Sequence, residues 1–206
     1  MTLDSILALF GFAFVMSLSP GPGNFLLLAS GVNFGFLRSL PLVLGISFGF
    51  LSMVFVVGIG FGEVLQRAPV IMTVLRLSCA AYVFYLAWKI ARIRSLGTAE
   101  ARDMPQPIGF VQAALIQLVN PKAWAVALIV TVSYTDQQDY LTSLITLIGL
   151  FALVNLPTIS VWAVSGVALR QFLSTERRLR LFNGGMAVLL LATMIPVLAD
   201  GVPILN

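Results

Sequence analysis

Hydrophobic residues along this chain form six long runs that are separated by short polar segments. The runs cover about residues 5–30, 37–62, 70–93, 109–133, 141–170 and 179–199. A helix needs about 20 apolar residues to cross a hydrocarbon core of roughly 30 Å, so each run is long enough to span a membrane. The runs lack the alternating polarity of membrane β-strands. The pattern therefore predicts an all-α, polytopic membrane protein with about six transmembrane helices.

The overall composition supports this class and excludes several others. Hydrophobic residues make up 59% of the 206 residues and charged residues only 10%, against about 25% charged residues in a soluble domain. Because the chain has no histidine and a single cysteine, Cys79, it lacks the ligands of a zinc site and the parts of a Ser-His or thiolate active site. Lys122 has no partner serine at a recognisable spacing for a Ser-Lys pair. We therefore expect no enzyme activity, no metal and no cofactor.

Basic residues gather on one side of the predicted topology. One face of the six-span arrangement carries Arg38, Lys89, Arg92, Arg94, Arg102, Arg170, Arg177, Arg178 and Arg180, and the other carries Arg67. Because basic loops stay in the cytoplasm, this predicts a cytoplasmic position for the first face and external positions for both termini. The net charge of +4 predicts contact with anionic lipid rather than with nucleic acid. The first 18 residues contain no Lys or Arg, so a cleaved signal peptide is not expected.

The first apolar run is interrupted near its middle by the segment Ser19, Pro20, Gly21, Pro22, Gly23 and Asn24. Two prolines remove two N–H donors and two glycines loosen the backbone, so the freed carbonyls need protein, water or a ligand as partners. A lone proline usually only kinks a membrane helix, whereas this cluster predicts a break that lines a cavity. The alternative is a re-entrant first run, which would leave five full spans and a cytoplasmic N-terminus; six spans are preferred.

A second interruption, Asn120, Pro121 and Lys122, lies at a similar depth in the fourth run. A lysine at the middle of a membrane costs at least about 2.5 kcal/mol, so Lys122 should face the interior of the bundle and meet an anion or the carbonyls of a broken helix. The polar linker 94–108 separates repeat one, residues 1–93, from repeat two, residues 109–206, within a single transmembrane domain. Three spans per half give the halves opposite orientations, which predicts two inverted three-helix repeats with broken helices 1 and 4.

Further polar and small residues occur at membrane depth. Gln112, Gln117 and Asn155 can hydrogen-bond a zwitterion or a neighbouring helix. Arg76, within the third run, and Glu63, just after the second, are candidates for ion coupling or gating. Glycine pairs spaced by four residues predict close helix packing and permit a homodimer. These pairs are Gly31 and Gly35, Gly45 and Gly49, and Gly58 and Gly62.

Three groups of residues follow one another in a specific order. The first is Ser19-Pro20-Gly21-Pro22 with Gly31, Gly35, Arg38, Gly45 and Gly49; the second is Pro69, Leu75-Arg76, Ala81-Tyr82, Tyr85-Leu86 and Trp88-Lys89; the third is Gly109-Phe110 with Asn120-Pro121-Lys122-Ala123. In this order and spacing they resemble the motifs of the lysine exporter (LysE/RhtB) family of amino-acid translocators, in particular its homoserine/threonine-resistance (RhtB-like) branch. The resemblance covers nearly the whole chain. It implies a bacterial inner-membrane protein that exports amino acids and uses the proton gradient.

From these features we expect a secondary transporter that exports a small neutral amino acid of the homoserine or threonine type by proton antiport and alternating access. Lys122 and the N–H groups of a broken helix would bind the substrate carboxylate, and the carbonyls freed by Pro20 and Pro22, with Asn24, would bind its ammonium group. The predicted site is completed by Ser19, Gly21, Gly23, Gln117, Asn120, Pro121 and Asn155. The lack of an acidic residue within a span favours a neutral substrate over lysine or arginine. Two alternatives are an ion or small-solute channel or carrier of the wider superfamily, and a structural membrane subunit.

Overall fold

The computed structural model describes residues 3–61, 69–93, 106–118, 120–136, 138–173 and 175–195. Within these ranges all regular secondary structure is helical, which confirms the all-α prediction. The helices are α1 (Leu3–Leu18), α2 (Pro22–Phe34), α3 (Phe36–Val56), η1 (Val57–Phe61), α5 (Pro69–Ala91), α6 (Phe110–Leu118), α7 (Pro121–Ser133), α8 (Tyr140–Arg170), η2 (Gln171–Leu173) and α9 (Glu176–Ala192).

The described helices include two that are long and apolar enough to cross a membrane without interruption. They are Phe36–Gly60, which is α3 with most of η1, and Tyr140–Leu173, which is α8 with η2. Two bent pairs meet the same criterion together: α1 with α2, bent by 56°, and α6 with α7, bent by 69°. The bends fall at the two breaks expected from the sequence. The chain is thus a polytopic all-α membrane protein, while the total of six spans, with α5 and α9 as the third and sixth, stays a prediction.

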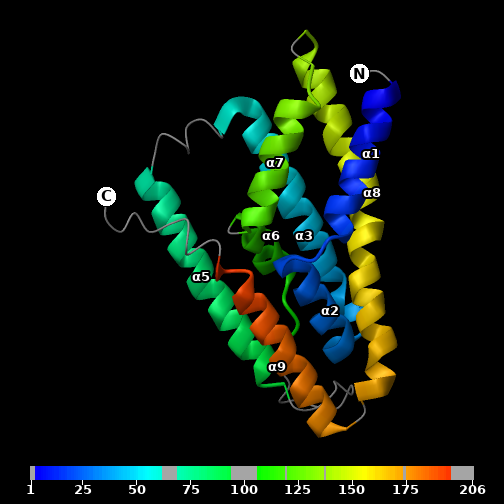
Figure 1. The fold of residues 1–206 in the computed structure, drawn as a ribbon, viewed down its shortest axis with the longest axis vertical. Coiled ribbons are helices and arrows are strands. Elements are labelled where there is room, and N and C mark those ends of the chain that lie inside the picture. The colour runs from blue at the N-terminus through cyan, green and yellow to red at the C-terminus, as the bar shows by residue number, and fades with distance from the viewer. Residues whose placement is uncertain are drawn as a thin grey trace.

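Figure 1 shows how the helices are arranged. The helices α1 and α7 lie toward the end of the bundle that holds the N-terminus, α2 and α6 continue toward the opposite end, and α5 and α9 form a pair at one side. Each bent pair packs against a continuous helix of the other half, α1 and α2 against α8, and α6 and α7 against α3. The two continuous helices contact each other, as do α5 and α9. The contacts that one bent pair makes thus match those of the other pair. The inverted repeat and the boundaries of its two halves stay a prediction.

Glycines bring the main chains of α2 and α8 into direct contact. A Cβ atom at Gly31 would lie 2.1 Å from the Ala163 carbonyl oxygen, and one at Gly166 would lie 2.2 Å from the Leu28 carbonyl oxygen. Both distances are far below a van der Waals contact, so a larger residue fits only if a backbone moves. The packing role predicted for Gly31 is confirmed.

Helices α3 and α6 cross in the same way. A Cβ atom at Gly45 would lie 2.3 Å from the Phe110 carbonyl oxygen, and one at Gly49 would lie 2.6 Å from the Ala114 carbonyl oxygen. The packing role predicted for this pair is confirmed as well. Gly35 has a different role, because it joins α2 to α3 with a φ of +83°, a conformation that glycine adopts at little cost.

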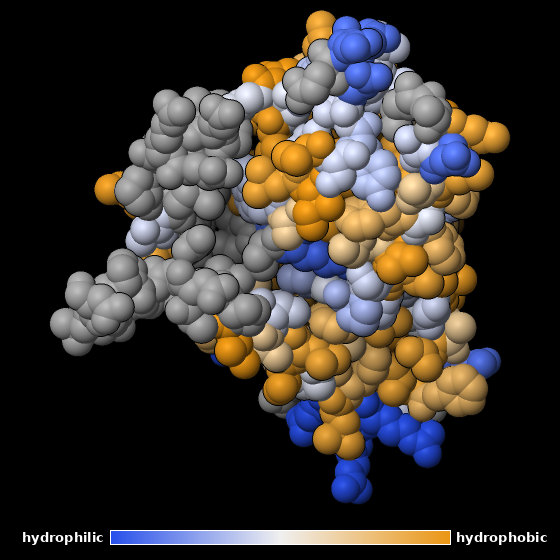
Figure 2. Space-filling model, turned by 45° about the horizontal axis from the view of Figure 1, so that its top comes forward, coloured by the Kyte–Doolittle hydropathy of each residue, from blue (hydrophilic) through white to orange (hydrophobic). Residues whose placement is uncertain are grey.

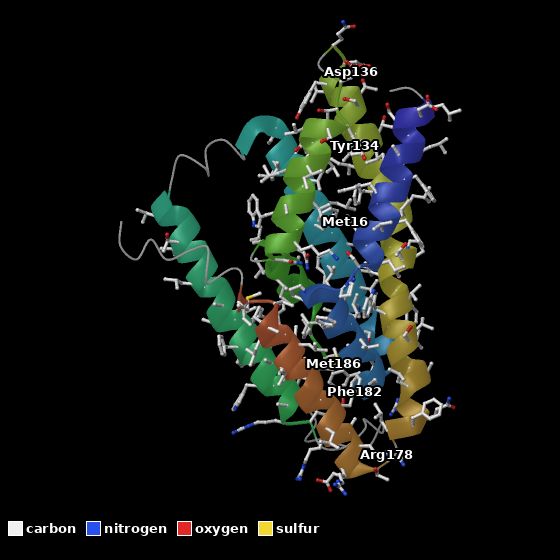
Figure 3. The ribbon with its side chains drawn as sticks, in the orientation of Figure 1. Met16, Tyr134, Asp136, Arg178, Phe182 and Met186 are labelled. Carbon is white, nitrogen blue, oxygen red and sulfur yellow. The ribbon has the colours of Figure 1, made fainter. Side chains whose placement is uncertain are left out.

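The buried apolar residues form two clusters, one on each side of the breaks. The upper cluster comprises Leu9, Ala13, Phe50, Met53, Val54, Val57, Ala123, Val126, Ala127, Val130, Leu147, Phe151 and Val154. The lower cluster comprises Leu26, Leu27, Ala29, Leu42, Val43, Ile46, Val83, Leu86, Ala87, Ile90, Ile108, Ala113, Ile116, Ile159, Ala163, Met186, Ala187, Leu190 and Met194. In Figure 3, Met16 and Tyr134, which pack on the upper cluster, lie above Met186, and Asp136 and Arg178 mark the two ends. The breaks therefore lie in a polar layer between two apolar layers.

A buried pair of amides fixes the lower end of the bundle. Asn33 Nδ2 donates to Asn183 Oδ1 at 2.9 Å, and Asn183 Nδ2 donates back to Asn33 Oδ1 at 3.1 Å. Asn183 also donates to the Ile93 carbonyl, just beyond the end of α5, at 3.1 Å. Both side chains are at most 1% exposed. The pair connects α2, α9 and the end of α5 through neutral side chains, and no local feature of the sequence predicts it.

Gly166→Ala should lower the free energy of unfolding by about 2 kcal/mol, because its Cβ would collide with the Leu28 carbonyl oxygen and force α2 away from α8. Gly149→Ala, in the same helix, is the matched control, since nothing lies within 4 Å of its Cβ position and alanine favours a helix. Thermal unfolding in detergent measures both variants. Equal stability of the two would contradict the close crossing.

Candidate functional site

A cavity of about 60 Å³ lies in the polar layer between the two breaks. It is lined by Met16, Ser17, Gly21, Gly23, Asn24, Ile46, Phe50, Gln117, Asn120, Lys122, Ala123, Val126, Phe151, Asn155 and Ile159. Such a cavity holds several water molecules, since one water needs roughly 10–15 Å³ of cavity volume. Figure 2 shows a strongly hydrophilic patch in the middle of a largely apolar flank of the molecule. Polar groups from both breaks therefore share one cavity.

Side chains of the first break satisfy several of the carbonyls that end α1. Ser19 Oγ donates to the Met16 carbonyl at 3.0 Å. Asn24 Nδ2 donates to two carbonyls, that of Ser17 at 2.9 Å and that of Ser19 at 2.8 Å. Asn24 thus caps the C-terminus of α1 from the first turn of α2, and this double contact fixes the bend.

Two tryptophans provide donors for the last carbonyl of each leading half-helix. Trp162 Nε1, on α8, donates to the Leu18 carbonyl at 3.2 Å, and Trp124 Nε1, on α7, donates to the Leu118 carbonyl at 2.7 Å. Leu18 ends α1 and Leu118 ends α6, so at both breaks an indole N–H donates to the last carbonyl of the half-helix. Neither tryptophan can be recognised as a capping donor from the sequence, because a tryptophan in an apolar run is equally typical of the membrane–water interface.

Lys122 joins the two breaks directly. Its Nζ donates to the Ser19 carbonyl at 2.6 Å, and its Cδ lies 3.1 Å from the position of a Cβ at Gly21. None of the described residues that line the cavity is acidic. Of the two kinds of partner expected for this lysine, an anion or a carbonyl of a broken helix, the structure contains the carbonyl.

Asn120 and Gln117 organise the second break. Asn120 Oδ1 accepts from the Lys122 backbone N–H at 3.1 Å, which caps the N-terminus of α7. Asn120 Nδ2 donates to Gln117 Oε1 at 3.1 Å. The two amides therefore hold the end of α6 against the start of α7.

Asn155 forms the polar part of the wall that α8 contributes. Its Nδ2 donates to Ser17 Oγ at 2.9 Å, and its Oδ1 accepts from Ser47 Oγ at 3.0 Å. These bonds connect α1, α3 and α8 beside the cavity. Ser17 and Ser47 do not stand out in the sequence, because a lone hydroxyl in an apolar run has no local feature that marks its partner.

The structure brings most of the predicted site residues together. Those that line the cavity are Gly21, Gly23, Asn24, Gln117, Asn120, Lys122 and Asn155. Ser19 meets Lys122 through its carbonyl, Pro22 and Pro121 begin α2 and α7, and Pro20 is exposed at the bend.

One further candidate has a described side chain. Gln112 is exposed and does not line the cavity. Glu63 lies outside the described residues, and so does the side chain of Arg76, whose backbone belongs to α5. Among the residues that the structure describes, no group of three His, Cys, Asp or Glu side chains could hold a metal ion.

The sequence is similar to proteins of a known family. The sequence profile described as LysE type translocator matches residues 14–200. A cysteine/O-acetylserine efflux protein of Salmonella typhi is 35% identical over 123 residues, which cover 59% of this chain and 61% of the relative. The protein of the same name from Escherichia coli (strain K12) is 34% identical over the same shares. The alignment thus spans 61% of the length of these relatives, and no solved structure matches the chain.

Trp162→Phe should lower the free energy of unfolding by about 1 kcal/mol, because the phenyl ring retains the packing but leaves the Leu18 carbonyl without its indole donor. Trp88→Phe is the control, since the Trp88 side chain is 52% exposed and does not line the cavity. Chemical unfolding in detergent measures both. If Trp162→Phe is as stable as the control, the Leu18 carbonyl does not depend on this indole.

Proposed function

This chain belongs to the LysE type translocator family, and from that membership and the cavity we propose that it is a secondary transporter that exports small neutral amino acids from the bacterial cytoplasm. The contact between Lys122 and the Ser19 carbonyl carries the proposal. It places a cationic donor and a carbonyl acceptor, the two groups that a zwitterion needs, side by side at one cavity. Membership in a family of translocators also favours transport over catalysis.

The walls of the cavity favour a zwitterion with a small uncharged side chain. A cationic side chain would meet Lys122, and the described part of the lining offers it no acidic residue. Ile46, Phe50, Val126 and Phe151 form an apolar part of the lining, which suits a short, uncharged side chain better than a charged one. Homoserine, threonine, cysteine and O-acetylserine fit this description, and the last two occur in the names of the relatives.

A bound substrate would replace the contact between Lys122 and Ser19. The carboxylate would accept from Lys122 Nζ in a charge-assisted bond, which is stronger than a bond to a neutral carbonyl. The released Ser19 carbonyl would then accept from the ammonium group of the substrate. In the empty carrier the two protein groups pair with each other. The Lys122 ammonium group therefore has a hydrogen-bond acceptor in both states.

Alternating access requires a seal on each side of the cavity, and the two apolar clusters are suited to that task. The lower cluster separates the cavity from the Arg178 end, and the upper cluster separates it from the Asp136 end (Figure 3). Basic residues gather at the Arg178 end, which we place in the cytoplasm with both termini outside. The substrate would enter through the lower cluster and leave through the upper one, driven by proton antiport.

Lys122→Met should reduce amino-acid counterflow in proteoliposomes by at least about 100-fold, because the substrate carboxylate would lose its buried counter-charge. The measurement uses labelled L-cysteine, O-acetyl-L-serine, L-homoserine and L-threonine. Lys89→Met, which removes the other lysine of the chain from α5, is the control and should retain counterflow. Full counterflow by a folded Lys122→Met protein would refute the carboxylate role.

A proton gradient should drive net transport by the wild-type protein. Proteoliposomes with an acidic lumen should accumulate the exchanged amino acid above its external concentration, because protons leaving the lumen would move substrate inward. A protonophore should abolish the accumulation but leave counterflow intact. Accumulation that is unaffected by the protonophore would refute proton coupling without touching the substrate site.

A further inference from the structure

The two half-helix N-termini at the cavity differ in their capping. At α7 the Asn120 side chain accepts from the Lys122 backbone N–H at 3.1 Å. At α2 the capping position is Gly21, and no side chain caps this end. The first turn of a helix leaves N–H groups, here including that of Gly23, without intrahelical acceptors. The positive end of the α2 dipole therefore meets the cavity uncapped.

Gln117 gives an independent indication that a ligand binds at the same place. Its side chain is 2% exposed and lines the cavity. Its Oε1 accepts from Asn120, but its Nε2 has no hydrogen-bond partner among the described residues. Buried amide N–H groups are almost always paired, because an unpaired one is costly. A hydrogen-bond acceptor supplied by a ligand would remove that cost.

The donors converge on the first turn of α2. Gln117 Nε2 lies 3.7 Å from the position of a Cβ at Gly23, and Lys122 Nζ lies 3.5 Å from that of a Cβ at Gly21. The two glycines leave the space in front of this turn free of side chains. A neutral amide, an ammonium group and backbone N–H groups therefore face one small volume, which suits an anionic group with two acceptor oxygens.

We propose that the N-terminus of α2, with Gln117 Nε2 and Lys122 Nζ, is the subsite for the carboxylate of the transported amino acid. The proposal rests on the proposed function and adds which half-helix binds the carboxylate and which neutral residue selects for it. Gln117 is a specificity-determining residue in this arrangement. A ligand without the carboxylate leaves its Nε2 unpaired, and buried polar groups left unpaired are the basis on which such sites reject ligands.

Substitution of Gln117 tests the subsite through selectivity. The substrate is whichever of L-cysteine, O-acetyl-L-serine, L-homoserine and L-threonine the wild-type protein exchanges fastest, and the competitor is its amino alcohol, in which CH₂OH replaces the carboxylate. Gln117→Met should raise the half-saturating concentration of the amino acid about tenfold or more and leave the weak inhibition by the amino alcohol nearly unchanged. Gln112→Met, on the same helix but exposed and outside the cavity, should change neither.

Two further variants keep the test independent of folding defects. Gln117→Glu preserves the Oε1 acceptor for Asn120 and replaces only the Nε2 donor, so it should weaken exchange of the amino acid at least as much. Gly23→Ala would place its Cβ in ordinary contact, 3.4 Å from Ile46 Cδ1 and 3.7 Å from Gln117 Nε2. The methyl group would fill the carboxylate position and reduce exchange about tenfold or more, whereas Gly11→Ala, with open space around it, should not.

The outcomes separate the subsite from the transport function. Loss of the preference for the amino acid over its alcohol in Gln117→Met, with reduced exchange in Gly23→Ala and both controls unchanged, supports the subsite. If Gln117→Met and Gln112→Met give the same half-saturating concentrations and the same preference, the subsite is wrong and the transport function stands. If the wild-type protein exchanges none of the four amino acids, the proposed function fails and the subsite fails with it.

Discussion

The arrangement of the helices depends on one constraint: the backbone carbonyls that the breaks leave free need hydrogen-bond donors. A helix that is interrupted inside a membrane exposes carbonyls that lipid cannot satisfy. At the end of α1 the donors are Asn24, Lys122 and Trp162, which belong to α2, α7 and α8. These helices must therefore meet at the first break, and the glycine crossings of α2 with α8 and of α3 with α6 bring the bundle together there. Two of these donors, Asn24 and Lys122, also line the cavity, so the same side chains serve the packing and the site.

The positions of the helices follow closely from the apolar pattern, because lipid imposes a similar length and polarity on every span. Helix α8 begins at Tyr140, one residue before the predicted start, and ends at Arg170 as predicted. Helix α9 begins at Glu176, three residues before its apolar run. The reason is local: the Thr175 side chain caps this end, and charged residues are well placed in a first turn that lies beyond the hydrocarbon core.

A site residue can be predicted from the sequence where placing its side chain in the membrane is energetically unfavourable by itself. It cannot be predicted where its role depends on a partner that is distant in the sequence. Lys122 and Asn24 stand out in the sequence, because a charged or amide side chain at midspan requires an explanation. Trp162, Ser17 and Ser47 do not, since each is ordinary in a membrane helix and acquires its role through a residue on another helix. Which of two similar half-helix ends is capped likewise depends on how the chain turns at the break.

The pairing of the first break also constrains how the chain is made. Leu18 receives its donor from Trp162, 144 residues later, and Ser19 receives the ammonium donor of Lys122 103 residues later. At about 5–20 residues per second, a ribosome needs on the order of ten seconds to complete such a stretch. During that interval these bonds depend on water or on the insertion machinery, because lipid offers no donor. The first break can therefore reach its final, fully hydrogen-bonded arrangement only after α7 and α8 have followed it, so the assembly of this site comes late in the synthesis of the chain.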